Sequence, residues 1–277
     1  MEPINESLKN QKKAKELPSS SKKIDICPVC GEPLGKLVKM PFGEIVGPRA
    51  CKCRREKTAK EKAENDARQR QGRLQAVIKN SMMNESFKEC TFKNWDHNKG
   101  NEKLYKAGLT YANRFKEYKK KNQGLLIYGS PGNGKTYFSA CIANELIKRI
   151  IPVICVSSIA LIERINESRN NYGNEGIFTV LNSLNNADLL ILDDLGTEQD
   201  TKWTRSMIYQ IIEKRYSSNL PIIITTNISL AELRDRYDDR VCSRLNKMCT
   251  FFNNPGKDIR KEEGKEKTKE LLKELFK

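Results

Sequence analysis

The chain has 277 residues and is strongly basic, with 51 Lys and Arg against 35 Asp and Glu and a formal net charge of +16. This length predicts one or two domains. The charge favours a polyanionic partner, nucleic acid before membrane, although a soluble basic surface is the open alternative. No apolar run approaches the roughly 20 residues of a membrane span, and no signal-peptide pattern is present. We therefore expect a cytoplasmic protein without a membrane partner.

Composition changes along the chain predict four segments. Residues 1–23 are polar and lysine-rich, and we expect a disordered basic tail there. Residues 24–57 contain Gly, Pro and four cysteines, which is typical of a small metal-binding module. Residues 58–80 are rich in helix formers and predict a helical linker. Residues 81–277 alternate apolar runs with helical patterns and predict one α/β domain.

Four of the nine cysteines form two close pairs. Cys27 and Cys30 precede Cys51 and Cys53 by a glycine-rich loop, which fits a four-thiolate zinc site. A short segment of this kind has little core and would depend on Zn²⁺ to fold. The alternative is a redox role for the first pair, but no thioredoxin-like βαβ pattern surrounds it. The other five cysteines are expected to be apolar fillers, and His97, the only histidine, is expected at the surface.

The α/β segment contains four short apolar runs that predict strands. They start at Gly124, Val153, Asp188 and Pro221, with helical patterns between them. Strands that alternate with helices predict a parallel sheet flanked by helices. The basic stretch from Asp258 predicts a partly exposed C-terminal helix.

A glycine-rich loop follows the first of these strands and opens a helix. It fits the phosphate-loop pattern G-x-x-x-x-G-K-[ST] in the context that this motif requires, with the residues Gly129, Ser130, Pro131, Gly132, Asn133, Gly134, Lys135 and Thr136. Backbone N–H groups and the helix N-terminus would bind the phosphates of ATP. Lys135 is expected to reach the β- and γ-phosphates, and the Thr136 hydroxyl to ligate Mg²⁺. A chance glycine turn is the alternative.

Polar residues follow two later strands. Asp193 and Asp194 end the third, where Asp193 would organise Mg²⁺ and Asp194 would polarise the attacking water. Asn227 ends the fourth and would orient that water. The alternatives are a helix-capping pair and a turn residue. Arg240 and Arg244 lie four residues apart, so one of them could neutralise phosphate in a neighbouring subunit, or both could be a surface pair.

These motifs, in this order, carry a family resemblance. The runs GSPGNGKT, LLILDDLGTEQDTKW, IIITTN, DRVCSRL and GKDIR resemble the AAA+ ATPase of DnaC/DnaI-type replicative helicase loaders, in the IstB-like ATP-binding protein superfamily. The resemblance runs from about Asn84 to the C-terminus and is shared with IstB-type transposition ATPases. It implies an AAA+ P-loop NTPase domain over residues 81–277, preceded by the zinc-ribbon-like module and the helical linker.

The resemblance also implies roles for single residues. It makes Arg244 an arginine finger acting in trans, Arg260 a second sensor that contacts phosphate in cis, and Asn227 the first sensor. It places a single-stranded DNA contact in the pore segment Thr201, Lys202 and Trp203, where an aromatic ring and a basic side chain suit an unpaired strand. Trp203 as a core residue is the alternative, because it begins an apolar helix face.

The function that the resemblance implies is an ATP-dependent loader. Such a protein binds a hexameric DnaB-type replicative helicase through its zinc module, self-associates with ATP into a ring or spiral, and delivers the helicase to single-stranded DNA in replication initiation. One departure is Asp194, where many AAA+ ATPases have Glu, and it predicts slow, switch-like hydrolysis. Another is the zinc module, which is shorter than in DnaI-type loaders and has only cysteine ligands.

Three other functions compete with this one. An IstB-like ATPase helper of a transposase shares the nucleotide motifs, but a zinc module is not a mark of that group. A zinc nucleic-acid-binding regulator, with nucleotide only stabilising the fold, would not need Asp193, Asn227 and Arg244 together. A small-molecule P-loop kinase would carry an acceptor-binding insertion, which is not apparent, and would not need so basic a chain.

Overall fold

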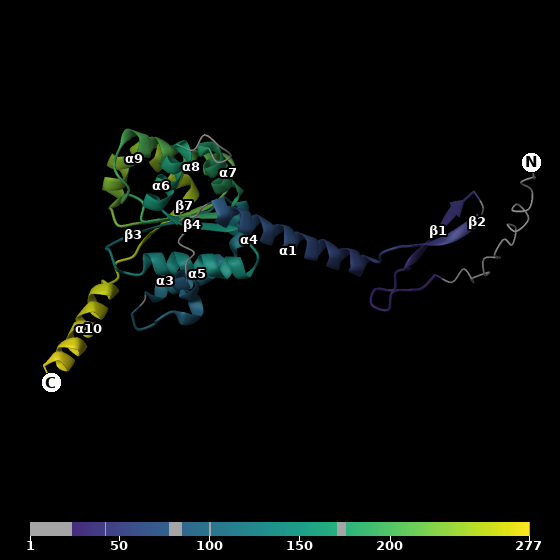
Figure 1. Cartoon of the computed structure of the whole chain (residues 1–277), viewed down its shortest axis with the longest axis horizontal. Coiled ribbons are helices and arrows are strands. Elements are labelled where there is room, and N and C mark those ends of the chain that lie inside the picture. Colours follow the sequence, from purple (N-terminus) through teal and green to yellow (C-terminus); the bar gives the residue numbers. More distant parts are fainter. Residues whose placement is uncertain (1–23, 42, 78–84, 100, 171–175, 277) are drawn as a thin grey trace, which may run out of the picture. The chain divides into compact units, whose positions relative to one another are not determined.

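A computed structural model describes residues 24–41, 43–77, 85–99, 101–170 and 176–276. The predicted tail, residues 1–23, and the end of the predicted linker therefore lie outside the described residues. The chain forms two compact units that divide between Ala63 and Glu64, each with its own arrangement of elements. Helix α1 (Lys52–Val77) starts in the first unit and continues into the second (Figure 1).

The first unit is built on a two-stranded antiparallel ribbon. Strands β1 (Gly35–Met40) and β2 (Gly43–Pro48) pair in a register that places Leu37 opposite Val46. Two cysteines precede the ribbon and two follow it, at the start of α1. The ribbon therefore brings the two cysteine pairs to the same end of the unit.

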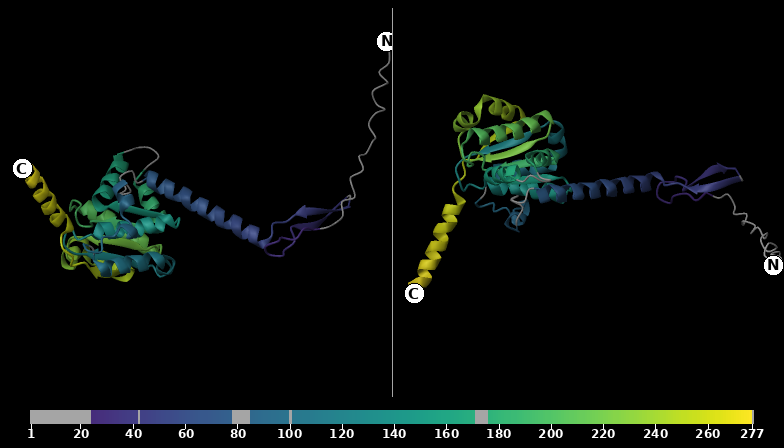
Figure 2. Two further views of the ribbon diagram at one scale, coloured as in Figure 1. Left: turned by 90° about the horizontal axis from the view of Figure 1, so that it is seen from below. Right: turned by 45° about the horizontal axis from the view of Figure 1, so that its top comes forward.

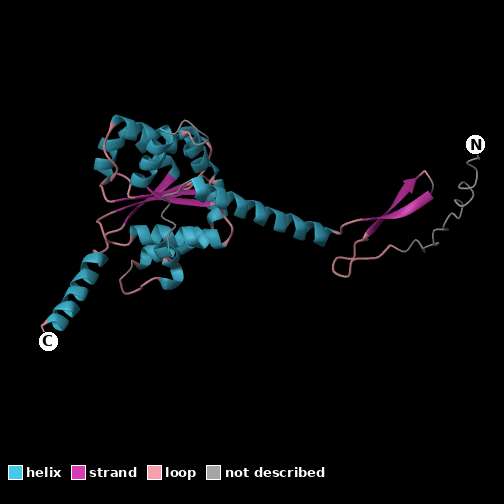
Figure 3. Ribbon diagram, viewed as in Figure 1, coloured by secondary structure: helices cyan, strands magenta, loops and turns pink. Residues whose placement is uncertain are grey.

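The second unit is centred on a five-stranded sheet whose strands are all parallel (Figure 3). The spatial order is β4-β5-β6-β3-β7. In chain order, the strands are β3 (Gly124–Tyr128), β4 (Val153–Ser157), β5 (Leu189–Asp193), β6 (Ile222–Thr226) and β7 (Cys249–Asn253). Every side chain of β5 and β6 is buried, which explains why both begin as continuous apolar runs.

Helices cover both faces of this sheet (Figure 3). The elements that pack on one face are α2 (Glu85–Glu89), the 3₁₀ helix η1 (Phe92–Asn94), α3 (Glu102–Asn113), α4 (Phe115–Lys120) and α5 (Lys135–Lys148). Those on the other face are α6 (Ser158–Asn170), α7 (Ile177–Asn186), α8 (Lys202–Ser217) and α9 (Leu230–Met248). Alternate residues of a strand enter the two cores, as Leu126 and Ile127 of β3 illustrate.

The last helix, α10 (Ile259–Leu275), leads away from the sheet in both views of Figure 2. No described residue of α10 is buried, and its short apolar face, Leu271, Leu272 and Leu275, is exposed. Its first turn is held by the Ile259 N–H, which donates to the Gly132 carbonyl at 2.9 Å. No helix in the described part of the chain is long and apolar enough to span a membrane.

The α/β architecture and the four predicted strands are confirmed, but β7 was not predicted from the sequence. This strand follows α9 directly, and polar residues interrupt and end its run CTFFN. It pairs with β3 at the edge of the sheet, where a continuous apolar run is not required. His97 lies at the surface as expected, and its imidazole Nδ1 contacts the Glu102 carboxylate at 2.5 Å.

Candidate functional site

A cavity of about 730 Å³ opens at the carboxyl edge of the sheet. Parallel strands end at one edge, so residues that follow β3, β5 and β6 meet there although they are distant in sequence. The cavity brings together most of the predicted nucleotide residues: Gly132, Asn133, Gly134, Lys135, Thr136, Asp193, Asp194, Asn227 and Arg260. Its size is that of a small-molecule site.

The phosphate loop adopts a conformation that needs glycine. Gly129 has φ 145°, and a Cβ there would lie 2.3 Å from the Asn254 carbonyl oxygen. Gly132 has φ 75°, and its Cβ would lie 1.9 Å from Asp258 Oδ1. The Lys135 ammonium donates to the carbonyls of Gly129 and Ser130 at 2.9 and 2.8 Å. It is therefore held within the loop, and burial lowers its pKa.

The predicted magnesium ligands lie next to each other. The Thr136 hydroxyl donates to Asp193 Oδ2 at 2.9 Å, and the Thr225 hydroxyl donates to Asp193 Oδ1 at 2.6 Å. Burial raises the pKa of Asp193 to about 6, because the low-polarity surroundings disfavour the charged carboxylate. Two oxygen donors at this separation fit the hard-ligand preference of Mg²⁺.

Asp194 and Asn227 form a second polar pair. The Asn227 amide donates to Asp194 Oδ1 at 3.0 Å. Asp194 has φ 52°, in the left-handed region that few non-glycine residues adopt. Its backbone N–H donates to the Thr225 hydroxyl at 2.9 Å. The Asp194 carboxylate is thereby directed to the cavity that it lines together with Asn227.

Asn254 is a site residue that the sequence did not reveal. It is fully buried and follows β7. Its amide donates to the Asn133 carbonyl at 2.9 Å, and the Asn133 amide donates to the Asn254 carbonyl at 2.6 Å. This reciprocal pair fastens the phosphate loop to the sheet. No sequence signal points to Asn254, because the strand that places it was not predicted.

A second unpredicted set forms a wall of the same cavity. Residues between Cys90 and Asn101 line it, together with Tyr137 of α5. Trp95 is 7% exposed, and its ring lies 5.8 Å from that of Tyr137. Aromatic surface beside a phosphate loop suits a planar nucleobase. A sequence signal existed, the aromatic cluster at Phe92 and Trp95, but it precedes the motif and was not connected with it.

The two arginines predicted to contact phosphate lie in different places. Arg260, in the first turn of α10, lines the cavity. Arg244 lies on α9 and lines a separate surface hollow. Its guanidinium forms an ion pair with Glu213 and lies 5.1 Å from the centre of the Tyr209 ring. Arg244 therefore does not line the nucleotide cavity of its own chain.

The predicted DNA segment begins α8. The Thr201 hydroxyl accepts the Thr204 N–H at 3.1 Å and caps the helix. Lys202 is exposed, whereas Trp203 is partly buried against the core. The structure thus assigns helix capping to Thr201 and core packing to Trp203, and leaves Lys202 accessible to a polyanion.

The four predicted zinc cysteines come together in the first unit. The sulfur atoms of Cys27, Cys30, Cys51 and Cys53 all lie within 4.8 Å of one another. Zn–S bonds of about 2.3 Å in a tetrahedron separate the sulfurs by about 3.8 Å, so this cluster is compact enough to hold zinc. Backbone N–H groups of Cys30 and Val29 lower the pKa of the Cys27 thiol to about 6, whereas hydrogen bonds to the Cys51 and Cys27 sulfurs raise the pKa of the Cys53 thiol to about 12. The sulfur atoms are therefore close enough to share protons, and the geometry of the cluster is what fits a metal ion.

A carboxylate joins the two halves of this cluster. Glu32 accepts the Lys52 N–H at 2.6 Å and an Arg55 guanidinium N–H at 3.2 Å. Glu32 thereby caps the N-terminus of α1, the helix that begins between Cys51 and Cys53. The remaining cysteines are buried or partly buried, as expected.

Comparison with known proteins gives three related findings. The model of the IstB-like ATP binding protein family matches residues 58–263, so the four clustered cysteines precede the matched range. The chain is 29% identical over 186 residues to the replicative helicase loader DnaC of Buchnera aphidicola subsp. Baizongia pistaciae, which covers 65% of this chain and 74% of that protein. It is 30% identical over 132 residues to the replicative helicase loader DnaC of Escherichia coli K12, with coverage of 47% and 54%. Thus the chain spans about half the length of the E. coli protein.

One solved structure supports the same fold. The crystal structure of DnaI superposes with a TM-score of 0.52 at 27% identity. The superposition covers 62% of this chain and 95% of that one.

Proposed function

The chain belongs to the IstB-like ATP binding protein family, and we propose that it is an ATP-dependent loader of a hexameric DnaB-type replicative helicase. The observation that carries the proposal is the meeting of Lys135, Asp193, Asp194 and Asn227 in one cavity. The similarity to DnaC proteins supports the choice of a loader.

The cavity supports ATP binding and hydrolysis. Lys135 and the loop N–H groups bind the phosphates, and the Trp95–Tyr137 wall receives the base. Thr136 and Asp193 are the residues that hold Mg²⁺, which neutralises charge on the β- and γ-phosphates when it is bound. Asp194, oriented by Asn227, polarises the attacking water. Its side chain is one methylene shorter than Glu, which favours slow, switch-like hydrolysis.

Assembly would complete the site. Arg244 lies outside the nucleotide cavity of its own chain, and its guanidinium is held by the Glu213 carboxylate and the Tyr209 ring. This position suits a residue that neutralises phosphate in a neighbouring subunit. ATP would thereby order a ring or spiral of chains. Lys202, exposed at the start of α8, is the residue of the Thr201–Trp203 segment best placed to grip single-stranded DNA.

The zinc module is the proposed helicase-binding part, over residues 24–57. Its four-sulfur cluster lies outside the range that the family model matches, so the nucleotide switch alone does not account for it. Apolar side chains are exposed on the ribbon, among them Leu37, Met40 and Ile45. A partner protein would cover such groups.

The first experiment is light scattering after size exclusion with the host's hexameric replicative helicase, with and without ATP. We expect a complex of defined stoichiometry that is lost when residues 1–57 are deleted. The second candidate function is an ATPase helper of a transposase, which the family name itself favours. No complex with the helicase, and binding to a cognate transposase instead, would select that alternative.

Steady-state hydrolysis tests the nucleotide site. Lys135→Ala should lower the hydrolysis rate on the order of a hundredfold or more, because the phosphate charge loses its neutralising ammonium. The matched control is Lys148→Ala, an exposed lysine at the end of the same helix. An unchanged rate in Lys135→Ala would reject the assigned cavity.

A further inference from the structure

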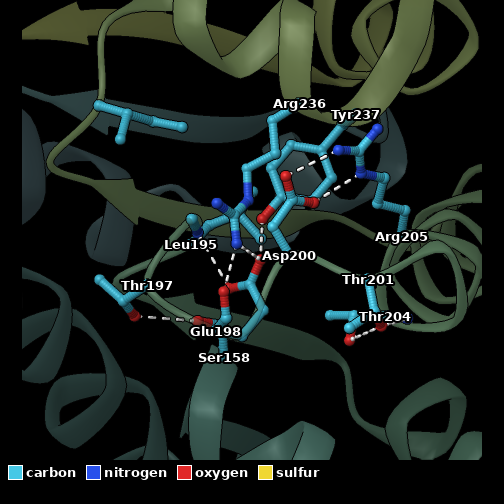
Figure 4. A network of polar contacts seen from close by, with 12 residues as sticks. Ser158, Leu195, Thr197, Glu198, Asp200, Thr201, Thr204, Arg205, Arg236 and Tyr237 are labelled. Carbon is cyan, nitrogen blue, oxygen red and sulfur yellow. Dashed lines mark hydrogen bonds and ion pairs between the residues drawn. The ribbon is translucent and has the colours of Figure 1, made fainter.

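The loop between β5 and α8, residues 194–201, is tied down by one buried carboxylate. The Glu198 side chain is 1% exposed. It accepts the Gly196 N–H at 3.0 Å. It also accepts the Tyr237 hydroxyl and pairs with the Arg236 guanidinium at 3.3 Å (Figure 4). Arg236 also donates to the Glu198 carbonyl. A buried carboxylate is costly unless it is paired and hydrogen-bonded, so these contacts act together.

This loop starts at Asp194, the second residue of the acidic pair in the nucleotide site. The Ser158 hydroxyl donates to the Asp194 carbonyl at 2.8 Å, and the Thr197 hydroxyl donates to the same oxygen at 2.7 Å. Asp194 is itself held at positive φ. The path of the loop therefore sets the orientation of the Asp194 backbone, and through it that of the carboxylate.

The partners of Glu198 lie at a break in α9. Asp238, directly after Tyr237, has φ 68° and ψ 168°, a combination that non-glycine residues rarely adopt. Its carboxylate accepts the backbone N–H groups of Arg240 and Val241 at 2.8 and 3.1 Å, so a new helical segment starts there. Arg244 lies on this second segment. The direction of Arg244 thus depends on this break at Asp238, which we call the hinge of α9. Glu198 contacts the two residues directly before it, Arg236 and Tyr237.

We propose that Glu198 is a positioning residue that latches the β5–α8 loop to the hinge of α9, so that Asp194 in a subunit's own site and the Arg244 that it offers to its neighbour are set together. The inference rests on the proposed action of Arg244 in trans. The latch adds a physical link between the conformation of one nucleotide site and the position of the arginine in the site of the neighbouring subunit. An arginine that must meet a phosphate across an interface tolerates little displacement.

The loop offers a matched pair of substitutions. Glu198→Gln keeps the shape and removes the charge that pairs with Arg236. Asp200→Asn makes the same exchange on the same loop, but Asp200 is 40% exposed and its partner Arg205 is 46% exposed. Tyr237→Phe removes one hydrogen bond to Glu198 and serves if Glu198→Gln does not fold.

The assay mixes two full-length chains with ATP and a thymidine oligonucleotide as the single-stranded DNA probe. Lys135→Ala should hydrolyse ATP only very slowly but still offers Arg244. Arg244→Ala has an intact cavity but offers no arginine. Mixing the two chains should restore hydrolysis, because the first supplies Arg244 to the intact cavity of the second. We expect Glu198→Gln, introduced into the Lys135→Ala chain, to reduce the restored rate about tenfold or more, and Asp200→Asn to leave it within about twofold. The affinity of the Glu198→Gln single variant for a fluorescent ATP analogue should stay within about twofold, which separates positioning from general damage.

The outcomes separate the latch from the proposed function. Full restoration by the Lys135→Ala, Glu198→Gln chain would overturn the latch and leave Arg244 acting in trans. Failure of the parent pair to restore hydrolysis would overturn the trans action and the latch with it. A weakened ATP affinity equal to the loss in rate would assign Glu198 a structural role and also overturn the latch.

Discussion

Strand β6 buries all of its side chains, whereas strand β2 buries none. The sheet of the second unit lies between two apolar cores, and its strands are stabilised by the area removed from water. The ribbon of the first unit has exposed apolar side chains on both faces, such as Leu37 and Val38. Its compactness rests on the cysteine cluster and on Glu32. The two regions therefore differ in what their residues gather around, which is an apolar core in the second unit and a cluster of four cysteines in the first.

Zinc removal should give the largest effect. A chelator, or Cys27→Ser, is expected to unfold the first unit, because structural zinc contributes on the order of 10 kcal/mol to such modules. The second unit should keep its melting temperature. Metal analysis and limited proteolysis measure the two effects. Cys242→Ser, outside the cluster, is the control and should retain the metal. Native protein without zinc would contradict the prediction.

A cavity created in the core of the second unit should destabilise that unit and leave the first unit unchanged. Leu126→Ala removes a fully buried side chain from β3. We expect the free energy of unfolding of the second unit to fall by about 2–5 kcal/mol, with unchanged zinc content. Denaturant titration followed by circular dichroism measures it. A loss below about 1 kcal/mol would show that the core is not packed as described.

Glu198→Gln should lower stability in a pH-dependent way. Burial opposes ionisation of Glu198, but hydrogen bonds from the Tyr237 hydroxyl and the Gly196 N–H outweigh it and lower its pKa below the ordinary value of 4.5. The carboxylate therefore stabilises the fold above pH 4.5, and this contribution is lost as the pH falls through the lowered pKa. We expect a difference of about 1–3 kcal/mol at pH 7 that narrows in acid.

Denaturant titrations at pH 7 and below pH 4.5 check this prediction. Asp200→Asn is the control, with about 0.5 kcal/mol or less expected for an exposed pair. A difference in unfolding free energy that does not change with pH would show that the charge of Glu198 does not cause the stabilisation.

Substitution on the ribbon should give the smallest effect. Val38 is 40% exposed, so Val38→Ala should change stability by no more than about 0.5 kcal/mol. Zinc content should not change. Thermal melting and metal analysis measure both. A larger loss would show that the ribbon face is covered in the isolated protein and would weaken the contrast with the sheet.

Features that depend on local sequence pattern were predicted from the sequence, whereas features that depend on tertiary contacts were missed. The four apolar runs predicted buried strands, because short apolar runs between helical patterns are typical of a parallel sheet. The phosphate loop and Asp193 were predicted from local pattern, since the loop follows one strand and the carboxylate ends another. Strand β7 and Asn254 were missed, because an edge strand needs no continuous apolar run and Asn254 acts through contact with the phosphate loop.

The sequence by itself determined which residues can carry nucleotide and metal chemistry, because glycine, lysine, carboxylate and cysteine spacing is a local property. The tertiary structure decided which of them meet. It placed Arg260 in the cavity and Arg244 outside it. It turned Thr201 into a helix cap and Trp203 into a packing residue. It also connected Glu198 with the hinge of α9, 39 residues later, because only the folded sheet brings the end of β5 next to that helix.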